Sequence, residues 1–260
     1  MQSTNGNWAV VTGASSGLGV EFAKILAARK INLVLTARSE APMQKLASEL
    51  ISTHGIQVSV IASDLAKPGS ATALRNRIDD QNIQPEILIN NAGYGFSGSF
   101  QLQSVEALNT MLQLDIISLT ELTHLFGERM KTAKRGHIML VSSMAAHQPV
   151  PMLAAYSASK AYVLSLGEAL HVEFAPDVNV TTLIPGLLNT GFAHAANYTA
   201  PKAALSSVIP TAEAAQIGID AMFARKPSVI AGTMNKIMAT MVPFVPRSTA
   251  AKIAFDMAKK

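Results

Sequence analysis

Short apolar runs rich in β-branched residues recur along the chain, and longer segments with apolar residues at every third or fourth position separate them. The short runs predict parallel strands covered on both faces, since such strands need continuous apolar character. The predicted strands lie at residues 8–12, 32–37, 57–62, 86–90, 137–142, 179–184 and 228–231. The helical spacing is clearest at residues 19–29, 43–53, 108–133 and 211–224. This alternation predicts right-handed crossovers and an α/β fold of the Rossmann type: a doubly wound parallel sheet of about seven strands in three α/β/α layers.

Two regions depart from this alternation. The first is residues 185–210, which show weak periodicity, and we expect residues 187–210 to form a loop that covers the substrate. The second is the tail at residues 235–260.

No change of composition, low-complexity tract or internal repeat divides the chain, so residues 1–260 are predicted to form a single domain.

The tail alternates Met, Ile, Val and Phe with Lys, and two prolines interrupt it. We interpret it mainly as core or subunit packing, because methionine commonly fills irregular apolar gaps. The first alternative is a lipid pocket. The second is contact with a membrane surface, since apolar and basic residues are mixed there. The residues that support this alternative are Met238, Met241, Val242, Phe244 and Val245 beside Lys236, Arg247 and Lys252.

Composition and charge exclude several classes of function. Of the 260 residues 49% are hydrophobic, enough for a buried sheet. No run approaches the roughly 18 apolar residues of a spanning helix, and the N-terminus does not resemble a signal peptide, so we expect a cytoplasmic protein. Cysteine is absent, which excludes thiol chemistry. The formal charge of +4 is spread along the chain, and without a basic cluster it predicts no nucleic-acid partner.

The six histidines do not form a metal motif. There is no H-E-x-x-H, and no histidine has another four residues later, so we predict no metal site. His147 precedes a candidate catalytic tyrosine and borders the substrate pocket in one interpretation; in the other it is a loop histidine without a role.

A glycine-rich turn, TGASSGLG at residues 12–19, follows the first predicted strand and precedes the first predicted helix. In this position Gly13 provides a tight turn, Gly17 lets the backbone approach a pyrophosphate, and Gly19 permits close packing of helix on strand. The helix N-terminus then faces the phosphates. The motif predicts a dinucleotide site formed by Gly13, Ser15, Ser16, Gly17, Leu18 and Gly19.

The end of the second predicted strand selects between the two dinucleotides. Arg38 lies 19 residues after Gly19, near the position where an acidic residue would bind the ribose hydroxyl of NAD. An arginine there can instead bind a 2′-phosphate with its planar fork, which predicts NADP(H) as the cofactor. The alternative is that Arg38 is only solvated and that Glu40 reaches the ribose.

A tyrosine and a lysine four residues apart begin a segment with a helical apolar stripe, so Tyr156 and Lys160 lie on one helical face. A phenol with a pKa of about 10 is a poor acid-base catalyst at neutral pH, and a neighbouring ammonium favours its ionised form. Ser143 follows the fifth predicted strand, where its hydroxyl can hydrogen-bond a substrate oxygen. Such a tyrosine and lysine alone occur on many helices, so they need support from other motifs.

That support is the full set of motifs, which resembles the short-chain dehydrogenase/reductase family in its single-domain branch. The resemblance runs from Trp8 to about Phe192. Its pieces are the glycine turn, Asp64-Leu65, Asn90-Asn91-Ala92-Gly93, a serine thirteen residues before the tyrosine, YSASK at residues 156–160, and Pro185-Gly186 followed by Thr190. The sequence is most similar to NADP-preferring reductases of ketoacyl chains and related carbonyl compounds.

The resemblance implies that Tyr156 is the general acid/base and that Ser143 orients the substrate. It implies that Lys160 both activates the tyrosine and binds the nicotinamide ribose. The cofactor contacts that it implies are Asp64 at the adenine, Asn91 at the adenosine ribose, Leu188 and Thr190 at the nicotinamide carboxamide, and in addition Leu65, Ala92, Gly93, Pro185 and Gly186. It also implies a homodimer or homotetramer.

One position departs from the family pattern. Asp115 lies where the resemblance places an asparagine whose main-chain carbonyl holds a water of the proton relay. We predict that Asp115 acts through its backbone carbonyl, which aspartate retains. The alternative is that its carboxylate competes with Tyr156 for the Lys160 ammonium and raises the tyrosine pKa.

The sequence therefore predicts an NADP(H)-dependent oxidoreductase that transfers hydride between nicotinamide and a small-molecule carbonyl or alcohol. Two alternatives stay open. One is an NADP-sensing regulatory protein that has lost turnover through Asp115. The other is a ketoacyl reductase that works at a membrane surface.

Overall fold

Seven parallel strands form one sheet in the computed structural model, which describes residues 7–188 and 207–258. The strands lie side by side in the order β3-β2-β1-β4-β5-β6-β7. Their bounds are β1 (Trp8–Thr12), β2 (Asn32–Ala37), β3 (Val58–Ala62), β4 (Pro85–Asn90), β5 (Gly136–Val141), β6 (Val178–Ile184) and β7 (Ser228–Ile230). The doubly wound sheet expected from the sequence is confirmed.

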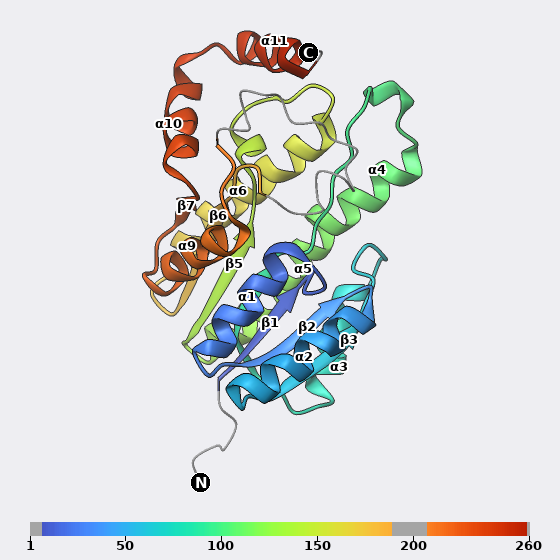
Figure 1. Ribbon diagram of the computed structural model, residues 1–260, viewed down its shortest axis with the longest axis vertical. Coiled ribbons are helices and arrows are strands. Elements are labelled where there is room, and N and C mark those ends of the chain that lie inside the picture. The colour runs from blue at the N-terminus through green and yellow to red at the C-terminus, as the bar shows by residue number, and fades with distance from the viewer. Residues whose placement is uncertain (1–6, 189–206, 259–260) are drawn as a thin grey trace.

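Helices connect the strands and cover both faces of the sheet (Figure 1). The α-helices are α1 (Gly17–Ala28), α2 (Glu40–His54), α3 (Ser70–Asp79), α4 (Val105–Leu112), α5 (Leu119–Thr132), α6 (Ala154–Phe174), α9 (Thr211–Phe223), α10 (Thr233–Met241) and α11 (Arg247–Ala258). Shorter helical turns accompany them: η1 (Phe100–Leu102), η2 (Gln113–Ser118), η3 (Met144–His147) and η4 (Val242–Phe244). Among the residues described, no helix combines the length and the apolar character needed to cross a membrane.

The single helix predicted at residues 108–133 is wrong in one respect. The structure interrupts it with η2, a π-helical segment that separates α4 from α5. A π segment widens one turn without changing the apolar spacing much, so periodicity alone cannot detect it. This segment contains Asp115, the residue that departs from the family pattern.

The two faces of β1 explain the two layers of helices. All five residues of β1 are buried, and successive side chains point to opposite faces. Ala9 and Val11 belong to the apolar cluster formed with α1, α2 and α9, whereas Trp8 and Val10 belong to the cluster formed with α3, α5 and α6. A strand buried in this way requires the unbroken apolar run from which it was predicted.

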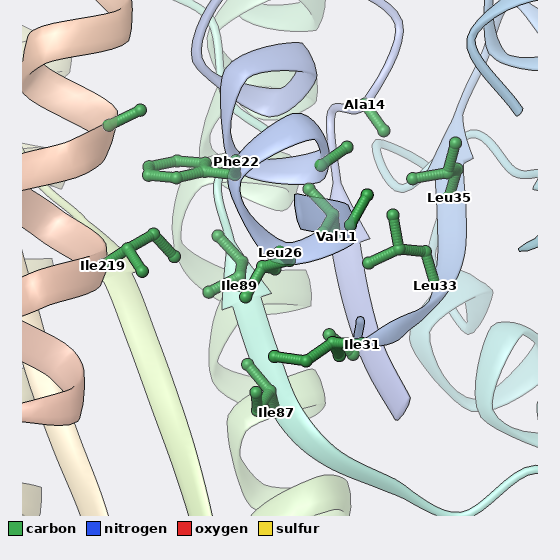
Figure 2. Close-up of a cluster of buried hydrophobic side chains, with 14 of the residues drawn as sticks. Val11, Ala14, Phe22, Leu26, Ile31, Leu33, Leu35, Ile87, Ile89 and Ile219 are labelled. Carbon is green, nitrogen blue, oxygen red and sulfur yellow. The ribbon is translucent and has the colours of Figure 1, made fainter. Parts of the chain in front are cut away.

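The first of these clusters has α1 at its centre. Figure 2 shows Phe22 and Leu26 of α1 over the sheet, with Val11 on β1 and Ile219 on α9 close by. Phe22 and Leu26 are fully buried. This packing fixes α1, and with α1 the glycine turn that precedes it.

The strand order reverses between β1 and β4. From β1 the chain proceeds outward through β2 and β3, and it then returns to β4 on the other side of β1. The loops that follow β1 and β4 therefore diverge, which opens a crevice at the carboxyl ends of these strands. Figure 1 shows α10 and α11 beyond the same end of the sheet. The tail at residues 235–260, to which the sequence assigned no secondary structure, thus contains most of α10, the turn η4 and α11.

We expect Phe22→Ala to lower the free energy of unfolding by about 3 to 5 kcal/mol, because it leaves a cavity in a closely packed cluster. Urea unfolding followed by circular dichroism measures this change. Val172→Ala is the matched control, since Val172 is 75% exposed and its truncation should cost less than about 0.5 kcal/mol. Equal effects of the two substitutions would show that α1 does not depend on this cluster.

Candidate active site

The glycine turn after β1 is shaped by close contacts that exclude side chains. Gly13 and Gly17 have φ angles of +69° and +55°, in the left-handed region. A Cβ on Gly13 would lie 2.7 Å from Nδ2 of Asn91, and a Cβ on Gly19 would lie 2.2 Å from the Gly13 carbonyl oxygen. Any larger residue at Gly13 or Gly19 would therefore push the turn away from β4 or from α1.

The N-terminus of α1 faces a cavity of about 870 Å³ at the carboxyl edge of the sheet. Ser16 caps this helix without a hydrogen bond from its side chain, so the first N–H groups of α1 keep their donor capacity. The cavity is lined here by Ser15, Ser16, Gly17 and Leu18. A turn with glycine at its closest contacts, followed by a helix N-terminus without a side-chain cap from Ser16, fits the pyrophosphate of a dinucleotide.

Hydrogen bonds tie the loop after β4 to the turn after β1. Oγ1 of Thr12 accepts from the backbone N–H groups of Asn91 and Ala92, both at 2.9 Å, and it donates to the Ile89 carbonyl. The Asn91 side chain donates to the Thr12 carbonyl at 2.8 Å. Asn91 thus holds the two diverging loops of the crevice at a fixed distance.

The expected adenosine end of the cavity lies at the carboxyl ends of β2 and β3. Its lining includes Ala37, Arg38, Ser39, Ser63, Asp64, Leu65 and Ala66. Arg38 is exposed toward this end. Glu40, the alternative ribose ligand, accepts a hydrogen bond from Gln44 at 3.3 Å along α2 and is not among the lining residues.

The three residues of the expected catalytic set meet at the other end of the cavity. Ser143 follows β5, whereas Tyr156 and Lys160 lie in the first turns of α6. Ser143 makes a hydrogen bond with the Tyr156 hydroxyl. Nζ of Lys160 lies 5.7 Å from the centre of the Tyr156 ring and donates to the Val141 carbonyl at 3.3 Å. Lys160 is therefore held between the end of β5 and the tyrosine.

The pKa of Tyr156 is raised above its ordinary value of 10.0, chiefly by burial, and Asp115 raises it further. The Lys160 ammonium and the hydrogen bond with Ser143 oppose this rise, because both favour the phenolate. Since the raised pKa leaves Tyr156 protonated at neutral pH, the residue can donate its proton to a neighbouring oxygen.

Asp115 contributes its side chain to the site, and not only its backbone. The carboxylate is fully buried; it accepts from the Tyr94 backbone N–H at 3.1 Å and from the Ser159 hydroxyl at 3.2 Å. Its Oδ2 lies 3.7 Å from Nζ of Lys160. Burial raises the pKa of Asp115, and the Lys160 ammonium and these hydrogen bonds oppose that shift. The geometry favours the alternative in which the carboxylate competes for Lys160.

Sequence reasoning missed three residues that shape the end of the cavity where Ser143, Tyr156 and Lys160 meet. A Cβ on Gly95 would lie 2.7 Å from the Tyr156 ring, so this glycine lets the ring pack against the loop after β4. Tyr94 and Ser159 hold Asp115 through the hydrogen bonds above. These positions belong to the segments NAGYG and YSASK, but only their contacts across the fold show what they do.

The loop after β6 and the helix α10 complete the end of the cavity where the nicotinamide is expected. Pro185, Gly186, Leu187 and Leu188 line the cavity. A Cβ on Gly186 would lie 2.4 Å from the side chain of Asn235, which is buried and donates to the carbonyls of Ala231 and Ser207. Asn235 thus fixes the start of α10 against the loop after β6, a role that the sequence did not indicate.

The C-terminal helices form a wall of the cavity. The residues that they contribute are Ile237, Met238, Met241, Val242, Val245, Ala250, Ile253 and Ala254. These residues line a cavity and do not fill a closed core, whereas packing of the tail against another subunit stays a prediction. A helical apolar stripe looks the same whichever apolar surface it covers, so the sequence could not distinguish the two cases.

Of the remaining expected site residues, some line the cavity and others do not. Ala92 and Gly93 line it, and a Cβ on Gly93 would lie 3.1 Å both from Oδ1 of Asp115 and from Nζ of Lys160. Thr190 and most of the expected substrate loop lie outside the described residues.

His147 is not a lining residue, and burial lowers its pKa. Within residues 7–188 and 207–258, no cluster of three histidine or acidic side chains is able to hold a metal ion.

This geometry is that of the dinucleotide-binding α/β proteins, in which the cofactor lies across a reversal of strand order. Comparison with known families shows to which family of such proteins the chain belongs. The model of the short chain dehydrogenase family matches residues 7–201. The chain belongs to the short-chain dehydrogenase/reductase family, and the resemblance stated from the motifs is confirmed.

Known relatives share the family and differ in length. Hydroxysteroid dehydrogenase-like protein 1 from Gallus gallus is 32% identical over 212 residues, which make up 80% of this chain and 62% of that protein. "Inactive hydroxysteroid dehydrogenase-like protein 1" from Homo sapiens is 32% identical over 197 residues, 74% of this chain and 59% of its own length. The chain thus spans about three fifths of these two relatives.

A solved structure extends the comparison. The short-chain dehydrogenase from Sphingobium yanoikuyae, in complex with NADPH, superimposes with a TM-score of 0.80 at 29% sequence identity. The match covers 86% of this chain and 87% of that one.

Asp115→Asn should lower the pKa of Tyr156, since it removes a carboxylate that raises this pKa and draws on the Lys160 ammonium. With Tyr156 as the proton donor that the resemblance implies, carbonyl reduction is fast below the tyrosine pKa and slow above it. We expect this basic limb to move to lower pH by about one unit. The measurement is the pH dependence of NADPH-dependent reduction.

Asp177→Asn is the control, because it makes the same change in a surface ion pair with Lys131. Its profile should match that of the unaltered protein. If the Asp115→Asn profile also superimposes, the position acts through its backbone alone.

Proposed function

We propose that this protein is an NADP(H)-dependent oxidoreductase that interconverts a carbonyl compound and the corresponding alcohol. The observation that supports it most directly is the meeting of Ser143, Tyr156 and Lys160 at one end of a cavity whose other end has the features of a dinucleotide site. Acid-base residues beside a nicotinamide position suit hydride transfer to a carbonyl carbon.

The lining residues fit the cofactor along its length. The N–H groups at the start of α1 would bind the pyrophosphate, and Asp64 and Leu65 would bind the adenine. Asn91 would adjoin the adenosine ribose, Lys160 the nicotinamide ribose, and Leu188 the carboxamide. When bound, the nicotinamide would supply or accept the hydride.

In this reaction the protein's own residues would transfer one proton. In the reductive direction the Ser143 hydroxyl would hydrogen-bond the substrate oxygen and hold it beside Tyr156. The Tyr156 O–H bond breaks as the proton passes to that oxygen, which balances the hydride gained at carbon and yields an alcohol. Lys160 would stabilise the phenolate that remains, and oxidation would reverse each step.

Arg38 supports NADP(H) over NAD(H). Its guanidinium is exposed at the adenosine end of the cavity, where a planar fork is able to bind a 2′-phosphate. Glu40, which would repel that phosphate, is turned along α2 toward Gln44. The related Sphingobium yanoikuyae enzyme was solved in complex with NADPH, which supports the same choice.

The cavity wall supports a neutral, largely apolar substrate. Beyond the catalytic residues, the described lining consists mainly of apolar side chains of η3, the segment after it, the loop after β6, and the C-terminal helices. Its charged members are Arg38 and Asp64 at the adenosine end and Lys160 at the catalytic end. A charged group at the substrate end would therefore lose hydration without gaining an ionic partner there.

A second candidate is a protein that binds NADP(H) but has little turnover. The name of the human relative, which includes the word "Inactive", and the buried carboxylate beside Lys160 favour it. Oxidation of NADPH in the presence of a panel of bulky apolar ketones and aldehydes separates the two candidates. The cytoplasmic location and the homodimer or homotetramer expected from the sequence stay predictions.

Tyr156→Phe should reduce turnover by about a hundredfold or more, because it removes the transferable proton and keeps the ring. NADPH affinity should change little, since the ring still packs on Gly95. Steady-state turnover and fluorescence titration of NADPH measure the two quantities. Retention of most of the activity would assign the proton transfer to another group.

Arg38→Asp should weaken NADPH binding about tenfold or more relative to NADH, because a charge-assisted hydrogen bond contributes about 1.5 kcal/mol or more. Titration of both cofactors gives the ratio of affinities. Lys45→Asp, an equal change of charge at an exposed position of α2, is the control and should leave the ratio unchanged. Equal binding of the two cofactors by the unaltered protein would show that Arg38 does not recognise the phosphate.

A further inference from the structure

Large apolar side chains are exposed on α10, η4 and α11 in an unusual concentration. Met234, Ile237, Met238 and Met241 recur at helical spacing along α10 and are 42% to 59% exposed. Phe244, in the turn η4, is 79% exposed, and Ile253 on α11 is 50% exposed. We refer to these six residues as the C-terminal apolar face. Exposure of this kind on a helix pair marks a surface that contacts an apolar partner.

This face is continuous with the mouth of the cavity. Ile237, Met238, Met241 and Ile253 line the cavity and are exposed to solvent at the same time. They therefore form part of its rim. Met234 and Phe244 lie outside the cavity and extend the apolar surface beyond the rim. Whatever covers the face also covers an entrance to the substrate site.

Basic side chains accompany the face. Lys236 on α10 and Arg247 and Lys252 on α11 are exposed, and none of the three has a carboxylate of the described chain within 4.0 Å. Asp256 is the acidic residue of the same helices in the described part of the chain. The surroundings of the face therefore carry net positive charge.

We propose that the C-terminal apolar face is a membrane-docking surface that binds the headgroup region of an anionic lipid bilayer. Apolar side chains would enter the boundary between headgroups and acyl chains, and the three basic groups would lie among lipid phosphates and carboxylates. Docking in this way needs no helix that spans the bilayer, because α10 and α11 would lie along its surface.

Charge favours a lipid surface over a second copy of the chain. If two such faces packed together, the basic side chains of both copies would be brought close to one another, with one aspartate from each to offset them. An anionic bilayer offers opposite charge and an apolar layer at the same depth. It also places the rim of the cavity against the phase in which neutral apolar molecules accumulate.

The test is co-sedimentation of the full chain with vesicles of phosphatidylcholine that contain phosphatidylserine, at low salt and without added substrate. The unaltered protein should bind, and binding should weaken as salt screens the charges. Phe244→Asp should weaken binding at least tenfold. The combined substitution Lys236→Gln, Arg247→Gln and Lys252→Gln should weaken it as strongly, and vesicles of phosphatidylcholine alone should bind less.

Val172→Asp is the matched control. Val172 is 75% exposed, close to Phe244 in exposure, but it lies on α6 away from the C-terminal helices. This variant should bind vesicles like the unaltered protein. NADPH titration of every variant shows that the fold and the cofactor site are intact, which separates this test from that of the proposed reaction.

Three outcomes would overturn the proposal. The first is that the unaltered protein does not sediment with anionic vesicles, and the second is that all variants sediment equally. The third is that Phe244→Asp splits an oligomer, seen by light scattering, without any change in vesicle binding. This third result would assign the face to contacts between copies of the chain.

Discussion

The burial of one ammonium group constrains the catalytic end of this protein. Lys160 is 5% exposed, and a charge removed from water is costly unless nearby groups replace the lost hydration. The carbonyl of Val141 accepts its hydrogen bond, and the carboxylate of Asp115 supplies an opposite charge 3.7 Å away. Tyr156, one helical turn earlier, then lies where the same ammonium acts on its hydroxyl. The charge of Lys160 therefore acts both on the carboxylate of Asp115 and on the hydroxyl of Tyr156.

A second constraint operates at the reversal of strand order, where the backbone comes too close for side chains. A Cβ on Gly13 would meet the loop after β4, and a Cβ on Gly19 would meet Gly13, both at distances too short for a Cβ. Thr12 and Asn91 bind the two loops by hydrogen bonds, so the crevice has a fixed width. Packing of α1 on the sheet through Phe22 and Leu26 holds the helix N-terminus at that crevice. The dinucleotide end thus depends on core packing as well as on the glycines.

The C-terminal helices are fixed at one end and expose apolar side chains beyond it. Asn235 fixes the start of α10 by hydrogen bonds to Ala231 and Ser207, but the helices beyond it expose much of their apolar surface. Some of their apolar side chains line the cavity and are exposed to solvent at the same time, and others lie outside the cavity. A segment with few buried contacts can move more readily than the sheet.

The sequence by itself determined the sheet, the glycine turn and the spacing of Tyr156 and Lys160, because each is set by local requirements. Buried strands need unbroken apolar runs, tight turns need glycine, and a four-residue step places two side chains on one helical face. Only the tertiary structure decided that the carboxylate of Asp115 meets Lys160, that Gly95 packs under Tyr156, and that the tail lines the cavity. Those facts depend on contacts between distant segments, and neither a π turn nor an apolar stripe shows in the sequence which surface it will meet.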